Sequence, residues 1–137
     1  MNRIDLQELS EIRIRESRAL LDAGFSDGAY YLAGYAVECA LKACIAKRTQ
    51  EHDFPDKKLV NDSHTHNLKT LLQLAELKTE MDAAIDVDPG MESVLGRIQE
   101  WSETSRYQKR TAQEAEALLK AIEDGKGGLL PWIRLHW

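Results

Sequence analysis

The sequence predicts an all-α fold, an antiparallel up-and-down bundle of four to five helices. Several segments place apolar residues three and four positions apart, which is the spacing of a helix with one buried face. No stretch alternates apolar and polar residues as a half-buried strand does. Turn formers separate the helical segments, among them Gly24, the pair Pro89-Gly90 and Gly125. Helices joined by short turns pack against one another as a bundle.

Length and charge limit the classes of protein that fit. A chain of 137 residues is one domain, and we expect residues 1–126 to form the bundle and residues 127–137 an apolar C-terminal tail. The net charge of −5 argues against a protein that coats nucleic acid non-specifically. No uninterrupted apolar stretch is long enough to span a membrane, and the N-terminus lacks the pattern of a signal peptide. We therefore expect a cytoplasmic protein.

The first helix is predicted over residues 5–23 and ends at Gly24, a C-terminal capping residue. Ser26 or Asp27 is predicted to cap the next helix. The few residues between the two helices predict an antiparallel hairpin. The expected buried stripe of the first helix consists of Leu9, Ile12, Ala19 and Ala23.

The central helix, predicted to run to about residue 48, is apolar nearly all the way round, so it should be buried among other helices. Glu38 and Lys42 interrupt this pattern at the i,i+4 spacing that favours an ion pair. Tyr31 and Tyr35 lie on the same stripe of the helix. Function is therefore expected to depend on this stripe. On the same helix, Cys39 and Cys44 point in different directions, which predicts reduced core residues rather than a disulfide.

The second half of the chain alternates polar and apolar segments. Residues 49–67 are polar and read as a long loop, and residues 68–77 as a third helix followed by a weaker helical stretch at 82–87. A fourth helix is predicted over residues 91–101. After a polar segment, Thr111 and Glu114 form a capping box that starts a fifth helix, closed by Gly125. The apolar tail should fold back on the bundle or meet another chain.

Three segments resemble the HEPN domain family, the "higher eukaryote and prokaryote nucleotide-binding" helical bundles. Residues 33–43 (AGYAVECALKA) resemble the signature of the family's second helix. Residues 66–72 (HNLKTLL) resemble the His-x-Leu-x-x-Leu-Leu opening of its third helix, and residues 105–107 (SRY) its Ser-Arg-Tyr segment before the last helix. The three occur in the family's order over about residues 12–124.

The resemblance implies a homodimer, frequently encoded beside a minimal nucleotidyltransferase in a toxin–antitoxin-like pair. Many members are metal-independent ribonucleases that use an Arg-x(4–6)-His motif. Downstream of Arg106 the next histidine is His136, so this motif is absent and no catalytic residue or cofactor is carried over. The resemblance thus favours a binding module that engages a nucleotide, a nucleic acid or a nucleotidyltransferase partner.

Seven residues are candidates for a ligand-binding site on these grounds. Each also has a structural interpretation: an ion pair within the helix for Glu38 and Lys42, core packing for the two tyrosines of the helix, a helix cap for His66, and a salt bridge to Glu38 for Arg106. Both interpretations stay open at the level of sequence. The candidates are Tyr31, Tyr35, Glu38, Lys42, His66, Arg106 and Tyr107.

Three other interpretations follow from the same residues. The protein could be a divergent ribonuclease in which His66 replaces the missing histidine and Arg106 binds phosphate. The tail could provide a dimer interface through Trp132, Ile133, Leu135 and Trp137. A histidine- and aspartate-containing segment could suggest a metal site, but its spacing lacks the regularity of zinc sites and no metal is expected. That segment contributes His52, Asp53, Asp62, His64 and His66.

Overall fold

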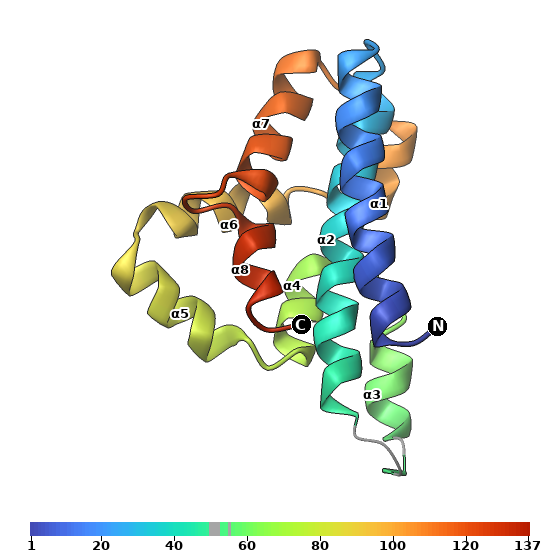
Figure 1. The fold of residues 1–137 in the computed structure, drawn as a ribbon, viewed down its shortest axis with the longest axis vertical. Helices are drawn as coiled ribbons and strands as arrows, with labels where there is room; N and C mark the ends of the chain where they lie inside the picture. Colours follow the sequence, from blue (N-terminus) through green and yellow to red (C-terminus); the bar gives the residue numbers. More distant parts are fainter. Residues whose placement is uncertain (50–52, 55) are drawn as a thin grey trace.

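A computed structural model describes residues 1–49, 53–54 and 56–137, and these residues contain helices and no strand (Figure 1). The predicted all-α bundle is confirmed. His52, considered above as a metal ligand, lies outside the described residues. The elements are α1 (Arg3–Asp22), α2 (Ser26–Arg48), α3 (Lys57–Asp62), α4 (Leu68–Leu74), α5 (Lys78–Val87), α6 (Gly90–Gln99), the 3-10 helix η1 (Glu103–Tyr107), α7 (Ala112–Glu123) and α8 (Leu129–Arg134).

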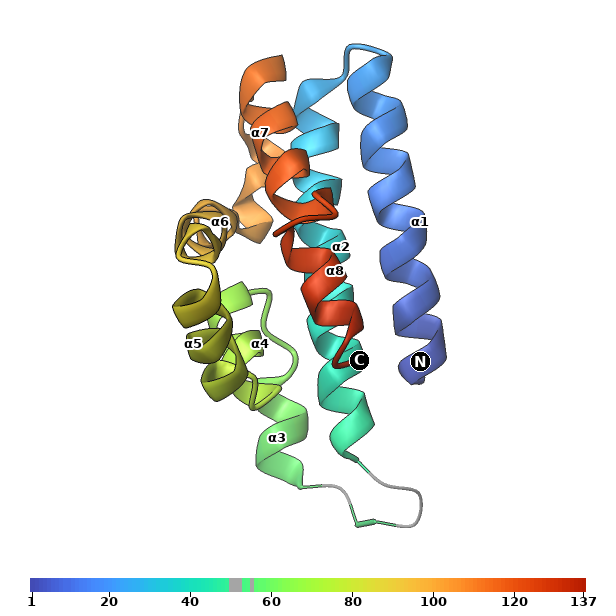
Figure 2. The same cartoon turned by 60° about the vertical axis from the view of Figure 1, so that its left-hand side comes forward.

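The two longest helices, α1 and α2, form the predicted antiparallel hairpin, and α7 and α8 pack along it (Figures 1 and 2). Gly24 adopts a φ of +88° in the turn, a conformation that favours glycine. The predicted cap of α2 was wrong, because the N-cap position is held by Phe25 without a side-chain hydrogen bond. Ser26 and Asp27 bond instead to the backbone of Arg110, as described below.

The face that α1 buries differs from the predicted stripe. Ile12 is 40 % exposed, and the buried residues of the helix are Ser10, Ile14 and Ser17. The Ser10 hydroxyl donates a hydrogen bond of 2.7 Å to the Ala36 carbonyl oxygen, and Ser17 donates likewise to α2. The hydroxyls are therefore satisfied although they are buried. Small serines let α1 approach the alanine-rich surface of α2 closely. A prediction based on apolar residues at helical spacing does not identify such polar contact residues.

The predicted loop over residues 49–67 contains a short helix, α3, and that prediction was therefore wrong in part. The Asp56 side chain caps it by accepting from the Lys58 backbone N–H, and Lys58 pairs with Asp62 at 2.5 Å. The predicted third helix ends early, at Leu74, because Glu76 adopts a φ of +56°. The weak helical stretch at 82–87 is the end of α5, which begins four residues after Leu74.

The end of the chain folds back on the bundle. The capping box of Thr111 and Glu114 is present, and α7 ends just before the predicted Gly125. The apolar tail forms α8, whose Leu129, Leu130 and Ile133 side chains are buried against α2 and α7. Arg134 of α8 contacts Glu11 of α1 at 2.8 Å. Among the described residues, no helix has the length and apolar character that crossing a membrane requires.

Both cysteines lie in the core as free thiols, in agreement with the sequence prediction. Burial raises the pKa of Cys39 to about 12 and that of Cys44 to about 11. Because the thiolate is the reactive form, these cysteines are inert packing residues in the folded protein.

A close approach joins α2 to the segment before η1. A Cβ atom added to Gly34 would lie 2.3 Å from atoms of the Trp101 ring. The Trp101 indole N–H donates to the Tyr31 carbonyl oxygen at 3.2 Å, which fixes the ring over the helix. Gly34 is thus required because the indole occupies the space of a side chain.

We expect Gly34→Ala to lower the free energy of unfolding by about 1–3 kcal/mol, because the added methyl group displaces the buried Trp101 ring. Helix propensity alone predicts the opposite sign. Gly96→Ala in α6 is the matched control: no atom lies within 4 Å of its Cβ position, so the gain in propensity should raise stability by roughly 0.5–1 kcal/mol. Urea denaturation followed by circular dichroism measures both, and equal effects of the two substitutions would contradict the packing argument.

Candidate functional site

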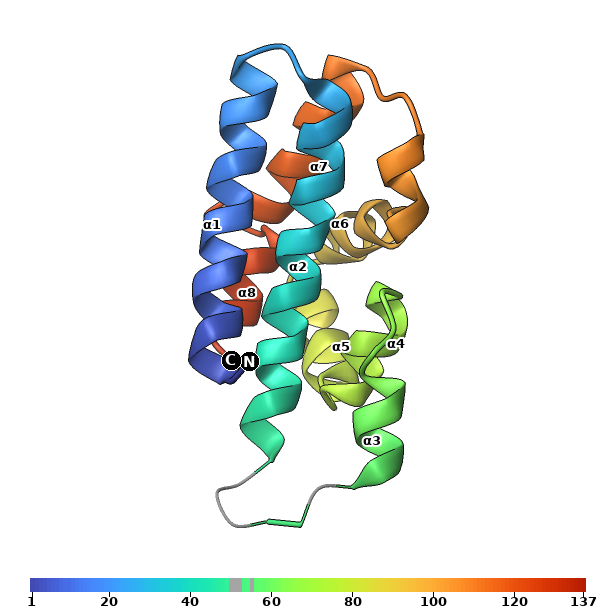
Figure 3. The same cartoon turned by 90° about the vertical axis from the view of Figure 1, so that its right-hand side faces the viewer.

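The helix α2, which carries the predicted stripe, lies between α1 on one side and η1 and α4 on the other (Figure 3). Tyr31, Tyr35, Glu38 and Lys42 follow one another at helical spacings of four, three and four residues, so their side chains share one side of the helix. The structure joins them to residues of the neighbouring elements in two clusters.

The first cluster is the polar triad, formed by Glu38, Lys42 and His66. The Glu38 side chain is 2 % exposed, and its Oε1 atom accepts from Lys42 Nζ at 2.8 Å and from His66 Nδ1 at 2.9 Å. His66 precedes α4, whose N-cap is the next residue, so this contact holds α4 to α2. The other carboxylate oxygen, Oε2, is buried and has no hydrogen-bond partner among the described residues. The buried charge is therefore stabilised by two donors on one oxygen.

The triad fixes which nitrogen of His66 carries the proton. A carboxylate paired with Lys42 only accepts hydrogen bonds, so Nδ1 of His66 must be the donor. In the neutral imidazole, Nε2 is then the acceptor. The His66 side chain is 48 % exposed, so the buried carboxylate of Glu38 orients an imidazole that is partly exposed to solvent.

The second cluster is the aromatic–cationic stripe, formed by Arg13, Tyr31, Tyr35, Trp101, Arg106 and Tyr107. The rings of Tyr35 and Tyr31 are stacked with centroids 6.2 Å apart, and Tyr31 is stacked with Trp101 at 6.0 Å. Arginines lie at both ends: Arg13 of α1 is 5.9 Å from the Tyr35 ring centroid, and Arg106 of η1 is 4.8 Å from that of Tyr107. Tyr31 and Tyr35 are half-buried, whereas Tyr107 is 78 % exposed.

Arg106 differs from most arginines of this chain in having aromatic rather than acidic neighbours. Hydrogen bonding to Tyr107, and then to Tyr31, raises the pKa of its guanidinium. In the described part of the chain it pairs with no carboxylate, and its side chain is exposed. The expected alternative, a salt bridge from Arg106 to Glu38, is therefore wrong: Lys42 and His66 occupy that carboxylate instead.

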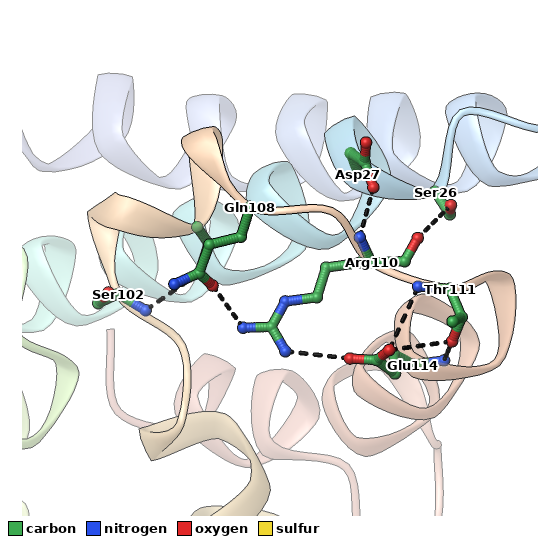
Figure 4. Close-up of polar contacts among 8 residues, drawn as sticks. Ser26, Asp27, Ser102, Gln108, Arg110, Thr111 and Glu114 are labelled. Carbon is green, nitrogen blue, oxygen red and sulfur yellow. Dashed lines mark hydrogen bonds and ion pairs between the residues drawn. The ribbon is translucent and has the colours of Figure 1, made fainter.

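Arg110 fixes the segment that follows η1 (Figure 4). Its backbone N–H donates to Asp27 Oδ1 at 2.5 Å, and its carbonyl oxygen accepts from Ser26 Oγ at 2.6 Å. Its guanidinium pairs with Glu114 at 3.0 Å and lies 4.2 Å from the centroid of the Tyr30 ring. Arg110 is thus a structural tie between α2 and α7 that holds η1 in place, and its charge is already compensated.

The seven predicted residues thus lie in two clusters, the polar triad and the aromatic–cationic stripe. Two members of the aromatic–cationic stripe, Arg13 and Trp101, were not among the site residues predicted from the sequence. Gly34 was the available signal for Trp101, because a glycine inside a helix often indicates a close approach. Among the described residues, no group of three or more histidines, cysteines or acidic residues is arranged to hold a metal ion.

Comparison with known proteins identifies the family. The family model described as "HEPN domain" matches residues 5–126, which is most of the chain. The chain therefore belongs to the HEPN domain family. No curated protein and no solved structure shows significant similarity to it.

The triad predicts a large cost for losing its carboxylate. Glu38→Ala leaves Lys42 and His66 without their acceptor, and we expect it to lower the free energy of unfolding by about 1.5–3 kcal/mol, because charge-assisted hydrogen bonds are lost while both remaining side chains are partly exposed and can be hydrated. Glu8→Ala, on the exposed side of α1, is the control and should change stability by less than about 0.5 kcal/mol. Urea denaturation provides the measurement. A cost for Glu38→Ala no larger than the control's would mean that the triad is not a stabilising contact.

Proposed function

We propose that this HEPN-domain protein is a binding module for single-stranded RNA, which contacts the aromatic–cationic stripe and the exposed edge of the polar triad. Membership of a family associated with nucleotides and RNA supports the class of ligand. Sequence-tolerant binding of single strands combines aromatic rings, on which bases stack, with cations that contact the phosphates. The stripe offers both kinds of group.

The observation that carries the proposal is the state of Arg106. Its guanidinium is exposed and pairs with no carboxylate in the described ranges, so it can bind a phosphate in a bidentate manner without breaking an ion pair seen there. Tyr107 beside it exposes most of its ring, so one base can stack there while the adjacent phosphate contacts Arg106. Lys42, whose side chain is 22 % exposed, adds a cation farther along α2.

Binding of a fluorescein-labelled 12-nucleotide single-stranded RNA, followed by fluorescence anisotropy, tests the proposal. A stacked base contributes about 1–3 kcal/mol, so Tyr107→Ala should weaken binding by about fivefold or more. Arg106→Gln should weaken it by a similar factor and reduce its dependence on salt. A duplex of the same length should bind more weakly, because paired bases cannot stack on the tyrosines.

Two substitutions outside the stripe provide matched controls. Phe54→Ala removes an aromatic ring that is 97 % exposed, and Arg15→Gln removes an exposed arginine of α1. Neither should change the affinity. The proposal is wrong if the wild-type protein does not bind the RNA, or if the stripe variants and the controls bind equally well.

A divergent metal-independent ribonuclease is the second candidate function, and the triad is the observation that favours it. A histidine whose Nδ1 is held by a buried carboxylate presents Nε2 as a proton acceptor, the arrangement of many general bases. Arg106 would then hold the scissile phosphate. The Arg-x(4–6)-His motif is nevertheless absent, and we expect a binding module without catalysis.

Incubation of the labelled RNA with the protein in the presence of EDTA separates the two candidates. We expect the RNA to stay intact, because His66 belongs to the polar triad, Arg106 belongs to the aromatic–cationic stripe, and the sequence lacks the Arg-x(4–6)-His motif. Metal-independent cleavage that His66→Gln abolishes, while Arg15→Gln leaves it unchanged, would establish the ribonuclease instead.

The remaining expectations concern partners. On the basis of the family resemblance, we also propose that the protein forms a homodimer. We further propose that it has a nucleotidyltransferase partner and acts in a toxin–antitoxin-like pair. Of the tail residues considered for a dimer interface, Ile133 is fully buried within its own chain and so is not available to a partner. Leu135 is exposed and is available. This makes the tail as a whole a weak candidate for the interface.

A further inference from the structure

A hollow of about 410 Å³ lies between α6, α7 and the glycine-rich segment that joins α7 to α8. Val94, Ala117 and Ala121 form an apolar floor of small side chains. Gly127, on its wall, adopts a φ of +126°, which favours glycine and leaves the wall without a side chain. None of the residues that line the hollow belongs to the triad or the stripe.

Three cations, Arg97, Lys120 and Lys126, line the hollow from three different segments. Each is exposed, and none forms an ion pair with a carboxylate in the part of the chain that the structure describes. Arginine and lysine side chains that line one concave surface from separate segments can donate hydrogen bonds to the same anion.

That Lys120 forms no ion pair with the residues that the structure describes has a structural reason. Glu116 and Glu123 lie four residues before it and three residues after it, at the spacings that allow ion pairs along a helix. Arg18 of α1 holds both carboxylates, at 2.9 Å and 2.6 Å. The docking of α1 on α7 therefore draws the acidic side chains away from the hollow and leaves the amino group of Lys120 available.

Two carboxylates, Asp88 and Asp124, also line the hollow, and both bond to the backbone of their own turns. Asp88 Oδ1 accepts from the Gly90 N–H at 3.0 Å, and Asp124 Oδ1 accepts from the Lys126 N–H at 2.9 Å. These bonds stabilise the turns that shape the hollow. Three cations against two carboxylates leave a net charge of +1, which favours an anion of low charge over a long polyanion.

We propose that this hollow binds a small organic phosphate, at a site separate from the aromatic–cationic stripe. The guanidinium of Arg97 and the amino groups of Lys120 and Lys126 bind the phosphate group, since Arg and Lys suit phosphate oxygens. The hollow is larger than a phosphate ion alone, and its volume lies in the range of small-molecule sites. The apolar floor accommodates the uncharged body of the ligand.

Nuclear magnetic resonance titration of the full chain tests the site, with ribose 5-phosphate as the probe and ribose and inorganic phosphate as comparisons. Ribose 5-phosphate should cause saturable shifts of the Gly90 and Gly127 amide signals. Inorganic phosphate should bind at the same place more weakly, and ribose should not bind. Losing one charge-assisted hydrogen-bond donor should weaken binding by about tenfold, so Arg97→Gln and Lys120→Gln are the test variants.

Lys69→Gln and Arg106→Gln are the controls, because neither residue lines the hollow, and both should leave the titration unchanged. Arg106→Gln also makes this proposal independent of RNA binding: it should impair RNA binding without affecting the phosphate titration. Absence of saturable shifts, shifts that ribose reproduces, or equal affinity of Lys120→Gln and Lys69→Gln would each overturn the assignment.

Discussion

The small side chains of α2 are the constraint on which the rest of the structure depends. Alanine and glycine on this helix let α1, α7, α4, η1 and α8 all pack against one central element. On the side that faces α1, small serine side chains of α1 pack against α2 and donate hydrogen bonds to its carbonyl oxygens. On the other side Gly34 admits the Trp101 indole. Larger residues on either side would separate the helices and lose both contacts, because protein interiors are close-packed.

The same central helix carries a buried carboxylate, which is costly unless its charge is compensated. Glu38 meets this requirement with donors from two elements, Lys42 within α2 and His66 before α4. A single interaction thus positions the short helix α4 and orients an imidazole. Arg106 takes no part in this cluster and has Tyr107 and Tyr31 as its neighbours instead.

The sequence was sufficient for what depends on local pattern. Helical periodicity predicted the all-α bundle, Thr111 and Glu114 predicted the start of α7, and the i,i+4 spacing predicted the Glu38–Lys42 pair. It was insufficient where tertiary contacts decide. Ser10 and Ser17 look polar in sequence yet form the buried face of α1, because their acceptors lie on another helix. The partners of Arg106 and Glu38 likewise depend on how η1 and α4 dock, which no spacing along the chain encodes.

The distribution of ion pairs explains how an acidic chain can present cations to anionic ligands. Arginines at helix interfaces are compensated within the fold: Arg18 holds two carboxylates of α7, and Arg110 holds Glu114. These pairs remove acidic side chains from the neighbouring surfaces as well as neutralising the arginines. Among the described residues, Lys120 beside the hollow forms no ion pair as a consequence, and Arg106 beside the stacked tyrosines pairs with no carboxylate either. The net charge of −5 therefore describes the whole molecule, whereas binding of an anion depends on charges within about one Debye length, roughly 10 Å.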